Sequence, residues 1–135
     1  MARPWLRHLW AWGPAVILLA AIFCETAIDH PYFMVGPLAG QDEPGHFAAY
    51  ALLCVLLWRA LRFSYRPWVF NWAPVLALVL SSLCGALDEY HKLFVPGRAG
   101  EVRDWAIDTL GALTAAVALL VYGELRKWAA AQRPE

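Results

Sequence analysis

Four long apolar stretches alternate with short polar segments along the chain, at residues 9–28, 44–61, 69–87 and 105–123. The first, third and fourth are each long enough for a helix to cross a hydrocarbon core of about 30 Å. The second is continuously apolar only over residues 47–58, a length that also suits a re-entrant segment. It still predicts a span, because Arg59 can extend toward the headgroups and His46 can face protein. The pattern therefore predicts an all-α fold, a bundle of four transmembrane helices.

Composition supports this fold. The chain has 135 residues, of which 61% are hydrophobic, and its mean hydropathy is +0.47. Soluble domains are about 45–50% apolar, and a soluble domain of this length could not bury so much apolar surface. The formal net charge is zero, so no global field points to a nucleic-acid partner. The sequence predicts a single transmembrane domain over residues 1–135.

The basic residues are unevenly distributed between the two sides that four spans create. One side holds Arg3, Arg7, Arg59, Arg62, Arg66, Arg126, Lys127 and Arg133, whereas the other holds Lys92, Arg98 and Arg103. Loops rich in lysine and arginine stay in the cytoplasm. Both termini are therefore predicted to be cytoplasmic.

Small residues predict how the helices pack. Ala73, Ala77, Ser81 and Gly85 recur every four residues in the third span, and Gly111 and Ala115 do so in the fourth. Such stripes let helices approach closely inside a bilayer, where no hydrophobic effect drives their association. We expect both stripes to face neighbouring helices.

Ionisable residues are dense at the predicted non-cytoplasmic ends of the helices. Charged groups at membrane depth usually face the bundle interior and pair with one another. Glu43, Glu101 and Arg103 are interpreted as solvated loop charges. The others form a candidate ligand-binding site of Asp42, His46, Asp88, Glu89, Arg98, Asp104 and Asp108.

Spacing relates several of these residues to one another. Asp42, His46 and Tyr50 are four residues apart and share a helix face, as do Asp104 and Asp108. Two neighbouring carboxylates need a compensating charge, for which Arg98 is the candidate. The alternatives are a purely structural ion-pair network, or a divalent metal held by oxygen and histidine ligands.

The same residues carry a resemblance to a known family. The segment Asp42-Glu-Pro-Gly-His46-Phe-Ala-Ala-Tyr50 resembles the D-K-x-x-H-F-x-x-Y motif of the VanZ-like membrane proteins. Two more motifs of that family have counterparts further along the chain. Residues 88–98, from Asp88-Glu89 to Pro96-Gly97-Arg98, resemble the motif D-E-x-x-Q-x-F-x-P-x-R. Residues 104–111, which contain Asp104 and Asp108-Thr-Leu-Gly111, resemble the motif D-x-x-x-N-x-x-G. The resemblance covers about residues 40–120.

Three positions depart from the family pattern. Glu43 stands where lysine is usual, Lys92 where glutamine is usual, and Asp108 where asparagine is usual. A lysine and an aspartate gained together suggest a compensating pair, Lys92 with Asp108.

The resemblance implies a multi-pass protein of the bacterial cytoplasmic membrane with a role in the cell envelope. The family's namesake is associated with tolerance to teicoplanin, a glycopeptide antibiotic with a fatty-acyl tail. The resemblance assigns no reaction, and neither the ligand nor the oligomeric state follows from the sequence.

Three hypotheses remain open. The first is an outward-facing pocket that binds a membrane lipid or lipid-linked headgroup. Arg98, and secondarily Lys92, would contact phosphate, while Asp104, Asp108 and Glu89 orient the arginine. The second is an enzyme in which Asp42 orients His46 as general base. A second acid or a metal would come from Asp88, Glu89, Asp104 and Asp108, with Glu89 as the catalytic candidate. The third, a transporter or proton pathway, has no chain of ionisable groups reaching the cytoplasmic side. The first hypothesis is preferred. The sequence does not identify a cofactor, and a divalent metal is the less favoured alternative.

Overall fold

The computed structural model describes residues 4–27, 42–63 and 67–132. The described residues form four helices, which are α1 (Pro4–Thr26), α2 (Asp42–Arg62), α3 (Pro67–Lys92) and α4 (Val102–Ala131). Each helix contains one predicted span, except that α1 ends at Thr26 and residue 28 lies outside the described residues. All four helices are long and apolar enough to cross a membrane. The predicted all-α, four-helix membrane fold is confirmed.

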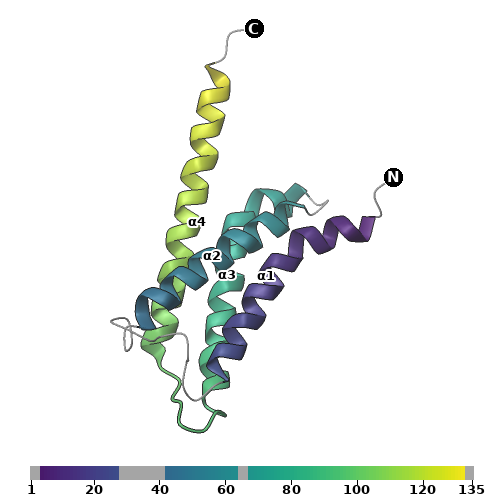
Figure 1. The fold of residues 1–135 in the computed structure, drawn as a ribbon. Helices are drawn as coiled ribbons and strands as arrows, with labels where there is room; N and C mark the ends of the chain where they lie inside the picture. Colours follow the sequence, from purple (N-terminus) through teal and green to yellow (C-terminus); the bar gives the residue numbers. More distant parts are fainter. Residues whose placement is uncertain (1–3, 28–41, 64–66, 133–135) are drawn as a thin grey trace.

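Successive helices run in opposite directions, so the two termini lie at the same end of the bundle (Figure 1). Helices α2, α3 and α4 pack against one another, and α1 packs on α2 and α3. We call the opposite end, where α1 and α3 end and α2 and α4 begin, the polar end. The described basic residues Arg7, Arg59, Arg62, Arg126 and Lys127 belong to helix segments at the end that holds the termini. Which end faces the cytoplasm stays a prediction from the positive-inside rule.

The small residues lie where the sequence predicts. Ala73, Ala77, Ser81 and Gly85 are all buried on α3. Gly111 and Ala115 are buried on α4. Gly111 allows the closest approach, because a β-carbon at this position would overlap the backbone carbonyl of Phe47 on α2. The α2–α4 contact therefore depends on a residue without a side chain.

Helix α1 bends along its length (Figure 1), and its sequence supplies the cause. Pro14 lies inside the helix and has no backbone N–H, so the carbonyl of Trp10, four residues earlier, lacks its helical donor. The Arg59 guanidinium of α2 donates to this carbonyl, with Nη2 3.0 Å from the oxygen. An arginine near the membrane surface thus satisfies the backbone group that the proline leaves free.

Candidate functional site

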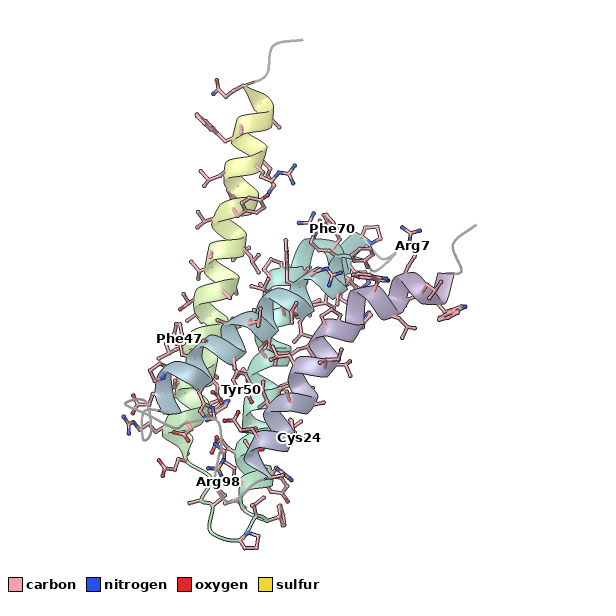
Figure 2. All side chains as sticks on the ribbon, viewed as in Figure 1. Arg7, Cys24, Phe47, Tyr50, Phe70 and Arg98 are labelled. Atoms are coloured by element: carbon pink, nitrogen blue, oxygen red, sulfur yellow. The ribbon has the colours of Figure 1, made fainter. Side chains whose placement is uncertain are left out.

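A polar pocket lies at the polar end, between the start of α2, the end of α3 and the start of α4. Figure 2 shows Arg98 at this end of the bundle, opposite Arg7 and Phe70, with Tyr50 nearer the middle of the bundle. The cavity has a volume of about 320 Å³. It is lined by His46, Lys92, Gly97, Arg98, Ala99, Glu101 and Asp104. We refer to these residues as the polar pocket.

Lys92 lines the pocket but is buried among three carboxylates. Its Nζ lies 2.6 Å from Glu89 Oε1, 3.4 Å from Asp104 Oδ2 and 3.9 Å from Asp88 Oδ2. The lysine side chain is only 5% exposed. One cation therefore compensates acids from both α3 and α4, which joins the end of α3 to the start of α4.

Two of these acids have further partners. The second oxygen of Glu89, Oε2, accepts the backbone N–H of Glu101 at 2.8 Å, just before α4 begins. Asp88 Oδ1 lies 2.9 Å from the hydroxyl of Thr26, at the end of α1. The end of α3 is thereby bonded both to α1 and to the segment that leads into α4.

His46 and Asp108 form a second pair across the bundle. His46 Nδ1 lies 3.1 Å from Asp108 Oδ1, and Asp108 is completely buried while the histidine side chain is 22% exposed. A carboxylate next to Nδ1 favours the tautomer with the proton on that nitrogen. Nε2 is then the nitrogen available to a ligand in the pocket.

A tight turn carries Arg98 into the pocket. The N–H of Arg98 donates to the carbonyl of Val95 at 3.2 Å. Pro96 and Gly97 occupy the two central positions, and Gly97 has a φ of 78°. Proline followed by a residue with positive φ is the signature of a type II turn, which favours glycine at the second central position. The family's P-x-R motif is therefore a turn that positions the arginine.

The Arg98 guanidinium has no charged partner among the residues that the structure describes. It makes no ion pair with any described residue, and its Nε is buried without a hydrogen-bond partner. A buried donor that lacks a partner costs free energy. Arg98 is therefore the cation of the pocket that is available to an anionic ligand.

An apolar groove of about 250 Å³ lies beside the polar pocket, between the end of α3 and the start of α4. It is lined by Ala86, Glu89, Tyr90, Leu93, Gly100, Glu101, Val102 and Trp105. Glu101 lines both the groove and the pocket. Tyr90, Leu93 and Val102 are exposed on the outer surface of the helices. A polar cavity and an apolar groove thus meet at one residue.

The interior of the bundle contains further buried polar atoms that make no hydrogen bond with the described residues. They are Tyr50 Oη, Ser81 Oγ, Asp88 Oδ2 and Asp108 Oδ2. Within the described part of the chain, no three histidine, cysteine or acidic residues are grouped so that they could hold a metal ion. The divalent-metal alternative therefore has no ligand cluster among these residues.

Two pairings predicted from the sequence are wrong. Arg98 does not compensate Asp104 and Asp108, because these carboxylates lie against Lys92 and His46. Lys92 does not pair with Asp108, because Lys92 is held by Glu89, Asp104 and Asp88.

The structure brings most of the candidate site residues together. His46, Arg98 and Asp104 line the polar pocket, and Asp88, Glu89 and Asp108 lie behind it, bonded to pocket residues or to α1. The side chain of Asp42 lies outside the described residues, so its predicted contact with His46 stays a prediction. Glu43 and Arg103 are exposed as expected and pair with each other.

Sequence reasoning missed two residues of the site. Glu101, interpreted as a solvated loop charge, lines the pocket, although its side chain is exposed. Thr26 is buried against Asp88, and its apolar sequence context gave no signal of this contact. The position of Glu101 in the sequence could have indicated its role, because it lies three residues before Asp104 and three residues after Arg98.

A model of the VanZ/LLP1 family matches residues 32–123 of the chain. The chain belongs to the VanZ family. No curated protein and no solved structure gives a significant match. The matched region of this VanZ-family protein contains the whole polar pocket and the apolar groove. The matched region also contains Phe47 and Gly111, the two residues at the close contact between α2 and α4.

Proposed function

We propose that this VanZ-family protein binds the phosphate-bearing headgroup of a membrane lipid in the polar pocket. The unpaired Arg98 guanidinium carries the proposal, because its planar fork of N–H donors suits phosphate oxygens better than a lysine ammonium does. His46 contributes a second donor or acceptor through Nε2. Lys92 is less available to a ligand, because three carboxylates already surround it.

The apolar groove supports a lipid over a soluble phosphate. An acyl chain in the groove would leave its headgroup next to Glu101, at the edge of the pocket. The groove opens on the outer surface of the helices, where a bilayer supplies lipid without desolvation. A ligand with both a charged head and an apolar tail fits the two adjoining sites.

The charge distribution and the family membership support a cellular setting for the proposal. The positive-inside rule places the termini in the cytoplasm and the polar pocket toward the exterior of the bacterial cytoplasmic membrane. A protein that binds envelope lipids there would influence tolerance to lipophilic envelope antibiotics, the property associated with the family's namesake.

The Arg98→Lys variant tests the role of the guanidinium. We expect native mass spectrometry of detergent-purified protein to show phospholipid adducts on the wild type, reduced about tenfold in Arg98→Lys through loss of one charge-assisted bidentate contact. The matched control is Arg103→Lys, because Arg103 does not line the pocket and the substitution keeps a positive charge beside Glu43. Equal adducts in Arg98→Lys and the wild type would contradict the proposal.

The His46–Asp108 pair favours an enzyme as the second candidate. A histidine held by a buried carboxylate through Nδ1 is the arrangement of a general base, with Asp108 in the orienting role predicted for Asp42. This candidate requires turnover of a lipid-linked substrate that falls at least a hundredfold in His46→Gln, while helical content by circular dichroism is unchanged. Lipid binding without turnover in the wild type would reject the enzyme and leave the binding function in place.

A further inference from the structure

The charges around the polar pocket restrict the kind of headgroup that it can hold. Two carboxylates, Glu101 and Asp104, line the cavity together with Arg98 and Lys92. Behind this lining, Asp88, Glu89 and Asp108 add further acidic groups. The charge of Lys92 is already compensated by the carboxylates around it. Acidic groups therefore outnumber the cations that can still pair with a ligand. A headgroup with only negative charge would meet one attractive guanidinium and several repulsive carboxylates.

We propose that the headgroup carries a primary amine as well as a phosphate, as phosphoethanolamine does. This inference rests on the proposed function and names the class of lipid. Arg98 binds the phosphate, and the carboxylates of Glu101 and Asp104 accept hydrogen bonds from the ammonium group. The net charge of such a headgroup is zero, so it adds no charge to the acidic site.

The two acids are free to accept an ammonium group. The carboxylate of Glu101 makes no ion pair or hydrogen bond with any described residue. Only the backbone of Glu101 is engaged among these residues: its N–H donates to Glu89, and its carbonyl accepts the N–H groups of Asp104 and Trp105. Asp104 uses only Oδ2, at 3.4 Å from Lys92, and its side chain is 28% exposed. An ammonium group has three donors, which matches several carboxylate oxygens at the edge of a cavity.

The positive and negative groups of the pocket come from different elements of the structure. Arg98 comes from the turn that follows α3, whereas Glu101 and Asp104 stand just before and within the first turn of α4. A headgroup with phosphate and amine two carbons apart can contact both elements within a cavity of about 320 Å³. A headgroup with a phosphate alone would leave the carboxylates of Glu101 and Asp104, which we call the acidic wall of the pocket, without a cationic partner from the ligand.

Lipid competition in native mass spectrometry tests the inference on the full chain. Delipidated protein is offered phosphatidylethanolamine, phosphatidylglycerol and phosphatidylcholine with identical acyl chains. We expect phosphatidylethanolamine to be preferred about tenfold over each of the others. Phosphatidylglycerol lacks the amine, and the quaternary amine of phosphatidylcholine cannot donate a hydrogen bond.

The Glu101→Gln variant tests the acidic wall, and Glu124→Gln is its control. Glu101 makes no capping hydrogen bond through its side chain, so its replacement leaves α4 intact. We expect Glu101→Gln to reduce the preference at least threefold and Glu124→Gln, on the exposed far part of α4, to leave it unchanged.

The outcomes separate this inference from the proposed function. Equal or tighter binding of phosphatidylglycerol would overturn the zwitterionic headgroup while phosphate recognition stands. Equal binding of phosphatidylcholine would overturn the requirement for a primary amine. Failure to retain any of the three lipids would overturn both proposals.

Discussion

Gly111→Ala is expected to disrupt the packing of α2 against α4. A β-carbon at position 111 would overlap the backbone carbonyl of Phe47, and a backbone atom cannot move aside as a flexible side chain can. Overpacking of a fixed contact costs about 1–3 kcal/mol and sometimes more. We expect the upper part of that range or beyond, because the two helices must separate along the face that also holds His46 and Asp108.

The measurement is thermal unfolding in detergent, followed by circular dichroism and by the loss of monodisperse protein on size exclusion. Gly123→Ala is the matched control, because it changes the same helix where a β-carbon would have no neighbour within 4 Å. The control should unfold at the wild-type temperature or slightly above it. If both variants unfold together, the close α2–α4 approach does not determine stability.

Lys92→Met is the second substitution with a large expected effect. It keeps the length and apolar stem of the side chain but removes the cation that lies among Glu89, Asp104 and Asp88. Breaking a buried ion pair by removing one partner costs about 3–5 kcal/mol, because the remaining charge stays buried without compensation. The variant should therefore unfold far below the wild type or fail to accumulate.

Lys127→Met is the control for this prediction. Glu124 and Lys127 have the same three-residue spacing as Glu89 and Lys92, with their charged atoms 2.7 Å apart, but both side chains are about three-quarters exposed. Exposed pairs contribute little, so Lys127→Met should leave the unfolding temperature unchanged. A second variant, Lys92→Met with Glu89→Gln, should recover part of the loss. Equal stability of Lys92→Met and Lys127→Met would show that the buried lysine does not hold α3 to α4.

The helices could be predicted from the sequence because a bilayer makes strong demands on length and hydropathy. The second span, with the shortest apolar core, forms α2, which extends from Asp42 to Arg62. The stripe of Ala73, Ala77, Ser81 and Gly85 was also predictable, because a period of four residues places small side chains on one helix face.

The partners of the charged residues were not predictable in the same way. Spacing shows which residues share a helix face but not which face of another helix they meet. Asp108 was therefore assigned to Arg98 or Lys92, although the α2–α4 contact at Gly111 brings His46 to it. The motifs did identify the residues that gather at one end, since His46, Arg98 and Asp104 all line the pocket.

The native mass spectrum of the wild-type protein, purified from membranes in mild detergent, tests the central claim most directly. The account predicts a bound phospholipid whose mass identifies its headgroup, retained by the wild type and Arg103→Lys and mostly lost in Arg98→Lys. A spectrum of bare protein, or of lipid that all three proteins retain equally, would contradict a headgroup site at Arg98.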